Sequence, residues 1–126
     1  MANILVVDDE PALLESMRSY LTRLGHSVTA FQNAETAWER VTADLCAYSV
    51  VIVDMTLEGM SGEEFIRRLL GRNPAVAVLA TSGYPGSLQN FETPPGARIA
   101  MLEKPFTPRM LTEALGRLLG EKSSAD

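Results

Sequence analysis

The sequence predicts an α/β fold in which a doubly wound, five-stranded parallel sheet carries helices on both faces. Short apolar runs recur along the chain, as is typical of strands buried on both faces of a parallel sheet. Segments with apolar residues at helical spacing alternate with these runs. The length of 126 residues suits a single domain, and we find no internal repeat or linker that would divide it.

The first half of the chain predicts strand, helix, strand and helix. The apolar run 4–7 is the first strand. Pro11 suits the first turn of the following helix and Gly25 its C-terminal cap, and the apolar residues between them recur at helical spacing: Leu13, Leu14, Met17, Leu21 and Leu24. Residues 27–31 form a short second strand. Asn33 then opens a helix whose buried stripe consists of Ala34, Ala37, Trp38 and Val41, with Trp38 interpreted as a packing residue.

The second half continues the alternation. The apolar run 50–53 ends on Asp54. Ser61, followed three residues later by Glu64, is a capping box, so a helix begins near residue 62, ends at 72–74 and buries Phe65, Ile66, Leu69 and Leu70. Residues 76–80 and 99–102 predict the last two strands. The final helix starts after Thr107 and Pro108, and its inward face consists of Leu111, Ala114, Leu115, Leu118 and Leu119.

A fourth helix is expected to be short or irregular. It should lie within residues 83–98, but glycines and prolines leave only about 87–92 free to be helical. A helix of under two turns is marginal on its own. We assign residues 1–120 to one domain and the polar residues 121–126 to a C-terminal tail.

Composition restricts the class of protein. The net charge of −5 argues against nucleic-acid binding, which needs a basic patch. A single cysteine, Cys46, cannot form an intramolecular disulfide, and we interpret it as a packing residue. With no signal peptide and no apolar stretch of about 20 residues, the sequence predicts a cytoplasmic protein that does not enter a membrane.

Polar residues follow or close the predicted strands: Asp8 and Asp9, Asp54, Ser82, and Lys104 before Pro105. Parallel strands deliver their carboxyl ends to one edge of the sheet, and at a topological switch point the first and third strands are neighbours. Three carboxylates should therefore meet there, repel one another and raise at least one pKa, with the titration belonging to the group. A divalent cation would relieve the repulsion, and hard oxygen ligands suit Mg²⁺.

These residues carry a family resemblance that spans nearly the whole chain. Val-Asp-Asp-Glu at 7–10, Asp54 with Gly62 eight residues later, Ser82-Gly83 and Lys104-Pro105-Phe106 resemble a response-regulator receiver domain, the phosphoacceptor half of two-component signalling. The stretch at 81–84 also resembles receivers at the ends of hybrid histidine kinases and some stand-alone receivers. The resemblance implies the flavodoxin-like strand order 2-1-3-4-5.

The resemblance also implies a role for each site residue. Asp54 would accept a phosphoryl group from a phosphohistidine, and the protein would catalyse its own phosphorylation and slow dephosphorylation. Mg²⁺ (or Mn²⁺) would be bound by Asp9 directly, by Asp8 through a water, by Asp54 and by the Thr56 carbonyl. Lys104, aimed by a cis peptide to Pro105, would bind a phosphoryl oxygen, and the Ser82 hydroxyl would move inward to bind another.

The implied partners are a sensor histidine kinase or histidine phosphotransfer domain, docking at the first helix, and an unknown output partner or an adjoining domain. A homodimer could form through the face of the fourth helix, fifth strand and fifth helix. Two positions depart from the family pattern and concern output: Met101 replaces a switching aromatic residue, and Glu58 replaces a common proline. The resemblance also implies that Tyr84, with Thr56, flanks the phosphate. We hypothesise that Tyr84 lengthens the phosphorylated lifetime or, alternatively, only packs.

Two other functions fit parts of the sequence. Val-Asp-Met-Thr at 53–56 is similar to the nucleophile motif of haloacid-dehalogenase phosphatases, but Asp54 lies on the third strand and the acids that such enzymes need downstream of the lysine are missing. A receiver that signals without phosphate would not need Asp9, Asp54 and Lys104. His26 is interpreted as an exposed turn residue rather than a phosphodonor.

Overall fold

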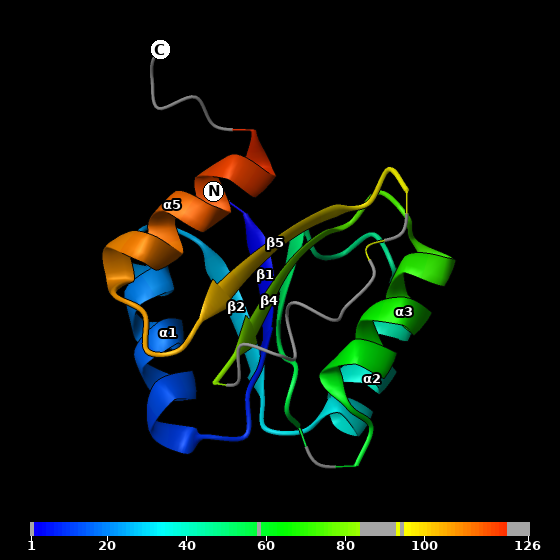
Figure 1. Cartoon of the computed structure of the whole chain (residues 1–126), viewed down its shortest axis with the longest axis horizontal. Coiled ribbons are helices and arrows are strands. Elements are labelled where there is room, and N and C mark those ends of the chain that lie inside the picture. The colour runs from blue at the N-terminus through cyan, green and yellow to red at the C-terminus, as the bar shows by residue number, and fades with distance from the viewer. Residues whose placement is uncertain (1, 58, 84–92, 94, 121–126) are drawn as a thin grey trace.

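The computed structural model describes residues 2–57, 59–83, 93 and 95–120. In chain order the elements are β1 (Asn3–Val7), α1 (Pro11–Arg23), β2 (Ser27–Phe31), α2 (Ala34–Ala43), β3 (Val50–Asp54), α3 (Gly62–Arg72), β4 (Ala77–Ser82), β5 (Arg98–Glu103) and α5 (Pro108–Leu119). The strands form one parallel sheet in the order β2-β1-β3-β4-β5, which confirms the predicted fold class and strand order. Figure 1 shows α1 and α5 on one face of the sheet and α2 and α3 on the other.

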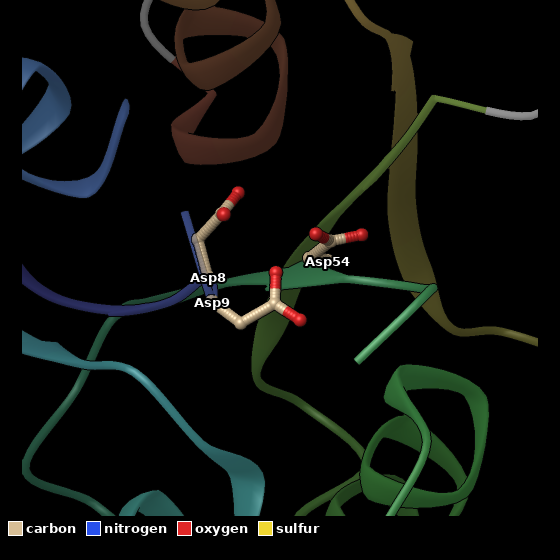
Figure 2. Close-up of side chains that lie close together, drawn as sticks. All are labelled: Asp8, Asp9 and Asp54. Carbon is tan, nitrogen blue, oxygen red and sulfur yellow. The ribbon is translucent and has the colours of Figure 1, made fainter. Parts of the chain in front are cut away.

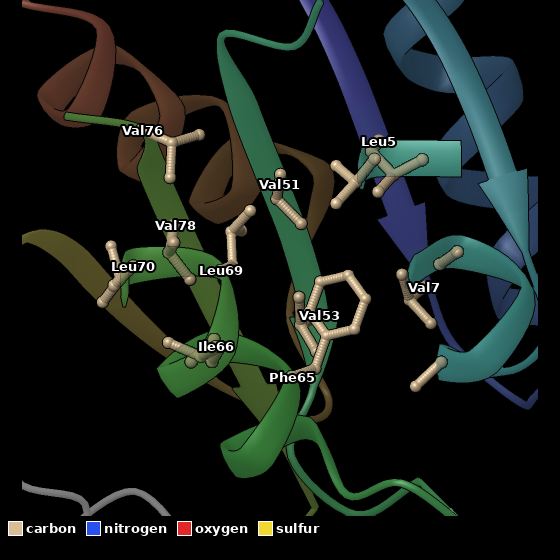
Figure 3. Close-up of a cluster of buried hydrophobic side chains, with 14 of the residues drawn as sticks. Leu5, Val7, Val51, Val53, Phe65, Ile66, Leu69, Leu70, Val76 and Val78 are labelled. Atoms are coloured by element: carbon tan, nitrogen blue, oxygen red, sulfur yellow. The ribbon is translucent and has the colours of Figure 1, made fainter. Parts of the chain in front are cut away.

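Alternation along the strands divides the core between these two faces. Ile4 and Val6 point toward α1 and α5, where they pack with Ile52, Leu79 and other buried residues. Residues of opposite parity point toward α2 and α3, where Phe65 lies at the centre of the second cluster (Figure 3). Both faces of the three central strands are therefore apolar, which explains the continuous apolar runs in the sequence.

Local signals in the sequence set where the helices begin. The side chains of Asn33, Ser61 and Thr107 each accept a hydrogen bond from a backbone N–H in the first turn of α2, α3 and α5 respectively. The Ser61 cap confirms one half of the expected capping box, while the Glu64 carboxylate pairs with Arg68. These caps satisfy donors that have no partner inside the helix.

The end of α1 confirms the predicted C-terminal cap at Gly25. Gly25 has φ +99°, and the N–H groups of Gly25 and His26 donate to the carbonyls of Thr22 and Leu21, which is a Schellman cap. The cap ends the helix at Arg23 and turns Leu24 away from the core. Leu24 is 47% exposed and does not belong to the buried stripe.

The last two strands are longer than their apolar runs. β4 continues through Thr81 and Ser82, and β5 extends from Arg98 to Glu103, because the backbone pairing of Ser82 with Glu103 does not depend on side-chain polarity. Val76 is buried but precedes β4. The strand ends therefore lie closer to the predicted site residues than the apolar runs indicate.

Three single residues were also predicted from sequence. Trp38 packs edge to face on Phe65 at a centroid distance of 5.6 Å, which confirms its packing role. Cys46 is exposed, so its interpretation as a packing residue is wrong, because it lies in the turn between α2 and β3 with its N–H bonded to Asp44. His26 is only half exposed, because its Nδ1 accepts a hydrogen bond from the Ala2 N–H at 3.1 Å.

Two expectations concern other parts of the chain. The short helix expected at about 87–92 and the tail at 121–126 lie outside the described residues. Within the described ranges, none of the helices has the length and apolar character needed to cross a membrane.

Candidate functional site

The alternation of the strands brings charged residues to one edge and one face of the sheet. Asp8 follows Val6 and Asp54 follows Ile52 on the face covered by α1 and α5, and Lys104 continues that face after Leu102. The N–H of Lys104 donates to the Ser82 carbonyl at 2.7 Å, which extends the β4–β5 pairing by one residue. Side chains from three strands thus meet at one place, as the sequence predicted.

The acidic cluster consists of Asp8, Asp9 and Asp54, and each of them offers one carboxylate oxygen within 4.8 Å of the others. Figure 2 shows the side chains of these residues gathered between β1 and β3. Asp8 and Asp54 are buried, whereas Asp9 is exposed. Carboxylate oxygens so arranged are the ligands that Mg²⁺ prefers, so the cluster fits a divalent cation.

The ammonium group of Lys104 connects the strands. Its Nζ lies 3.0 Å from Asp8 Oδ2, 2.9 Å from Asp54 Oδ2 and 2.9 Å from Glu10 Oε1. Lys104 is itself only 15% exposed at its side chain. The peptide bond between Lys104 and Pro105 is cis, as the family resemblance implied. Within the described residues, the ammonium group of Lys104 is thus paired with three carboxylates at this site.

Burial and ion pairing perturb two of these groups. Burial is the largest influence on Asp8 and raises its pKa, against the opposing effects of the Glu10 N–H and Lys104; the charge of Asp54 adds a smaller increase. Burial would lower the pKa of Lys104, but the hydrogen bonds to Glu10, Asp54 and Asp8 together outweigh it and raise the pKa. The predicted rise in a carboxylate pKa is confirmed, but its main cause is burial rather than mutual repulsion.

The second oxygen of Asp54 is held from the loop that follows β3. Asp54 Oδ1 accepts hydrogen bonds from the N–H of Thr56 at 2.9 Å and from its hydroxyl at 2.8 Å. Lys104 holds Oδ2. Both carboxylate oxygens of Asp54 thus accept hydrogen bonds, which fix the orientation of the side chain at the carboxyl end of β3.

The loop between β3 and α3 fits closely against its surroundings. A Cβ atom on Gly62 would lie 2.1 Å from the Asp54 carbonyl oxygen, so only glycine allows α3 to start so near the end of β3. Glu35, at the start of α2, accepts a hydrogen bond from the Met60 N–H at 2.8 Å. Gly59 has φ +75°, and a Cβ there would lie 2.6 Å from Glu35 Oε2. The loop is therefore fixed at both of its ends.

Ser82 and Thr81 occupy the end of β4. Thr81 pairs in register with Asp54, and Ser82 points to the opposite face of the sheet from Thr81. Both side chains are buried. Within the part of the chain that the structure describes, the Thr81 hydroxyl has no hydrogen-bond partner. Ser82 thus lies next to the site in the sheet, but its side chain points, like that of Ala80, to the face covered by α2 and α3.

A cleft of about 760 Å³ opens over the site. It is lined by the acidic and basic groups and by an apolar rim, namely Asp9, Glu10, Ala12, Leu13, Asp54, Thr56, Gly83, Lys104, Pro105 and Phe106. The cleft gives access to Asp54 from solvent. It is wide enough for a small phosphorylated molecule or for a side chain of a partner protein.

The sequence analysis did not assign two residues that hold the site. Glu10 was noted only as part of the motif at 7–10, and its contact with Lys104 is visible only in three dimensions. A third acid immediately before Pro11 was the available signal. The contact between Glu35 and the Met60 N–H joins positions 25 residues apart and left no signal in the sequence. Of the two residues that depart from the family pattern, Met101 is half-buried against the Phe65 cluster, whereas Glu58 lies outside the described residues, as does Tyr84.

Comparison with known families decides what kind of domain carries this site. The family model for the response regulator receiver domain matches residues 4–116. The chain belongs to the receiver-domain family. Receiver domains are components of two-component signalling, so the resemblance found in the sequence is confirmed.

Relatives differ in how much of them this receiver spans. It is 31% identical to the response regulator protein FleR of Pseudomonas aeruginosa, over 96% of this chain but only 26% of that protein. It is 29% identical to a CheY homologue of Campylobacter jejuni, a chemotaxis protein, with 95% and 94% of the two chains covered. Receivers of this kind thus occur both within longer proteins and nearly alone.

Solved structures agree with the fold. The response regulator TrrA of Thermotoga maritima, in complex with Mg²⁺ and BeF, is 25% identical and superposes with a TM-score of 0.83 over 94% of this chain and 99% of that chain. A receiver protein of Sinorhizobium medicae gives the same TM-score at 29% identity, with 94% of each chain covered.

Proposed function

We propose that this receiver takes a phosphoryl group from a phosphohistidine onto Asp54, in a reaction that depends on Mg²⁺ or Mn²⁺, and signals its phosphorylation to a partner. The observation that carries the proposal is the position of Asp54, buried at the end of β3 yet open to the cleft and in contact with Lys104. We propose residues 1–120 as the unit that performs this function.

Asp54 is the nucleophile of the proposed reaction. One carboxylate oxygen forms a bond to phosphorus while the bond from phosphorus to the donor imidazole nitrogen breaks, and the electron pair stays on that nitrogen. No general base is needed, because the carboxylate attacks in its ionised form. Thr56 and Lys104 orient the carboxylate from its two sides.

Asp8, Asp9 and Asp54, with the Thr56 carbonyl, are the proposed ligands of the cation. The burial and raised pKa of Asp8 support this assignment, because a buried carboxylate beside two others is stabilised by a positive partner. When bound, a divalent cation neutralises charge on the transferred phosphoryl oxygens. Asp9, the exposed member, is accessible to an ion that arrives from the cleft.

Lys104 and Ser82 are the proposed groups that bind the new phosphoryl oxygens. The ammonium of Lys104 already lies 2.9 Å from Asp54 Oδ2. It would therefore be close enough to stabilise negative charge on the oxygens of a phosphoryl group attached to Asp54. Phosphorylation changes the charge at Asp54 from one negative charge to about two and adds acceptor oxygens. The Ser82 hydroxyl would turn inward to bind one of these oxygens. This movement would shift the equilibrium between the inactive and active conformations of the receiver.

The proposed donor is a sensor histidine kinase or a histidine phosphotransfer domain, and the protein would catalyse its own phosphorylation and slow dephosphorylation. The output would pass to a partner or to an adjoining domain, since FleR and similar relatives are longer than this chain. A homodimer through the face of the expected fourth helix, β5 and α5 is a further form that this output could take.

Intact-mass measurement with acetyl phosphate tests the proposal. We expect the protein to gain one phosphoryl group in Mg²⁺ and none in EDTA, and Asp54→Asn to gain none under either condition. Uptake that does not require Mg²⁺ would contradict the metal assignment. A failure to gain mass from acetyl phosphate or from a phosphorylated histidine donor would instead favour a receiver that signals without phosphate.

A further inference from the structure

Three carboxylates crowd the ammonium group of Lys104: Glu10 and Asp54 accept hydrogen bonds from it, and Asp8 forms an ion pair with it. An ammonium group has three N–H donors. Three carboxylate oxygens lie within 3.0 Å of Lys104 Nζ, one each from Asp8, Glu10 and Asp54. A phosphoryl oxygen that binds Lys104 must therefore compete with these carboxylates for space and charge around Nζ.

The three carboxylates differ in how easily they can leave. The side chains of Asp8 and Asp54 are 1% and 2% exposed, so losing Lys104 would leave a buried charge without its partner. The side chain of Glu10 is 61% exposed and can be hydrated as soon as it leaves. Glu10 is thus the partner that Lys104 can release at the smallest cost in free energy.

The backbone around Glu10 holds it at the cleft without using its side chain. Its N–H donates to Asp8 Oδ1 at 2.9 Å, and Pro11 follows as the first residue of α1. Glu10 occupies the N-cap position of α1, yet its side chain makes no capping hydrogen bond. The carboxylate reaches Lys104 instead, at the wall of the cleft through which a phosphoryl group enters.

We propose that Glu10 is a positioning residue that occupies the place of a phosphoryl oxygen on Lys104, so that its carboxylate competes with the entering phosphoryl group. This inference rests on the proposed phosphorylation of Asp54. Glu10 keeps the ammonium at the cleft before the donor arrives and sets how strongly the donor is bound. It touches neither phosphorus nor the leaving group and acts through Lys104 alone.

Kinetics of phosphorylation by acetyl phosphate test the competition. Glu10→Gln keeps the shape of the side chain but removes its charge, so the half-saturating concentration of acetyl phosphate should fall by about threefold, the range expected for one exposed ion pair. The maximal rate should stay near that of the unmodified protein, because the groups around Asp54 are unchanged. A lower maximal rate or an unchanged half-saturating concentration would overturn the proposal.

Two further variants separate contact from overall charge. Glu15→Gln removes the same charge from α1, where Glu15 pairs with Arg18 outside the cleft, and should leave both kinetic constants unchanged. Glu10→Asp keeps the charge but shortens the reach to Lys104, so it should behave like Glu10→Gln. If Glu15→Gln matches Glu10→Gln, or if Glu10→Asp matches the unmodified protein, the effect is one of net charge and the proposal is wrong.

Salt gives an independent measure of the same distinction. At about 1 M salt the Debye length is about 3 Å, so an effect of net charge at a distance should vanish while a direct contact retains part of its effect. Persistence of the difference between Glu10→Gln and the unmodified protein is the expected result. If the unmodified protein is phosphorylated and its Glu10→Gln variant is indistinguishable, only the inference about Glu10 fails; if neither is phosphorylated, the proposed function fails first.

Discussion

The two walls of the pocket around Asp54 are built on different principles. The β1 wall, residues 8–10, consists of three acidic residues, and Lys104 forms ion pairs with two of them, Asp8 and Glu10. The β3 wall, residues 54–57 and 59–62, is held by close fit and hydrogen bonds: Gly62 lies against the Asp54 carbonyl, and Glu35 accepts a hydrogen bond from the Met60 N–H. Charges on the β1 wall can be altered without a change in backbone shape. The β3 wall has no room for an additional methyl group at Gly62.

This difference separates the chemistry of the site from its geometry. Charges on the β1 wall are available for a cation and for exchange of partners at Lys104. The packing of the β3 wall keeps Asp54 in one place while those charges rearrange. We therefore expect substitutions in the β1 wall to alter phosphorylation more than folding, and substitutions in the β3 wall to do the reverse.

Lys104→Ala should have the largest effect, because Lys104 contacts both walls. Phosphorylation by acetyl phosphate should slow by about a hundredfold, as is typical when a donor to transition-state charge is lost. Asp8 and Asp54 would also lose their buried partner, which should lower the free energy of unfolding by about 3 kcal/mol. Urea denaturation without Mg²⁺ measures the second effect, and an unchanged midpoint would show that the ion pairs do not stabilise the fold.

Gly62→Ala should have the next largest effect and should act through the fold. The new methyl group would lie 2.1 Å from the Asp54 carbonyl oxygen, and overpacking of this kind costs about 1–3 kcal/mol. Gly71→Ala is a matched control on the same helix, since its Cβ would have nothing within 4 Å. The control should stabilise the protein by up to about 1 kcal/mol. Equal urea midpoints for the two variants would mean that the β3 wall is looser than the structure shows.

Asp9→Asn should separate metal binding from folding. Asp9 is exposed, so the substitution should change the free energy of unfolding by less than about 0.5 kcal/mol in EDTA. Added Mg²⁺ should raise the melting temperature of the unmodified protein, because it binds the folded state, and should raise that of Asp9→Asn much less. If both proteins respond equally to Mg²⁺, Asp9 is not a ligand.

Glu35→Gln should have the smallest effect, and it should depend on pH. The Met60 N–H lowers the pKa of Glu35 from its ordinary value of 4.5. The stabilisation from this carboxylate is therefore complete above that value and is lost as the pH falls through the pKa of the folded protein. Urea midpoints of the unmodified protein and Glu35→Gln should converge on acidification. A difference that does not change with pH would mean that the bond to Met60 is absent in solution.

Much of this comparison could be predicted from the sequence, but not all of it. The meeting of Asp8, Asp54 and Lys104 followed from where apolar runs end, because parallel strands align their carboxyl ends. The alternation of faces also explains why these side chains point the same way. Both signals, the ends of the apolar runs and the alternation of side chains along a strand, depend only on neighbouring residues, so they can be recognised before the fold is known.

What the sequence did not predict depends on contacts between distant segments. Glu10 contacts Lys104, and Glu35 accepts a hydrogen bond from the Met60 N–H. In both cases a long side chain joins residues that are far apart in the sequence. Burial, which dominates the pKa of Asp8, is a property of the assembled sheet. Leu24 follows the helical spacing of the apolar residues in α1, but spacing alone does not show that the predicted turn at Gly25 leaves this side chain exposed.

Mapping of the phosphorylated residue tests the central claim most directly. Hydroxylamine attacks the carbonyl carbon of an acyl phosphate, releases phosphate and leaves a hydroxamate at the modified residue. After treatment with acetyl phosphate and Mg²⁺ and then with hydroxylamine, mass spectrometry of peptides should locate the hydroxamate at Asp54. A hydroxamate at Asp8 or Asp9, or a phosphoryl group that resists hydroxylamine, would contradict the account.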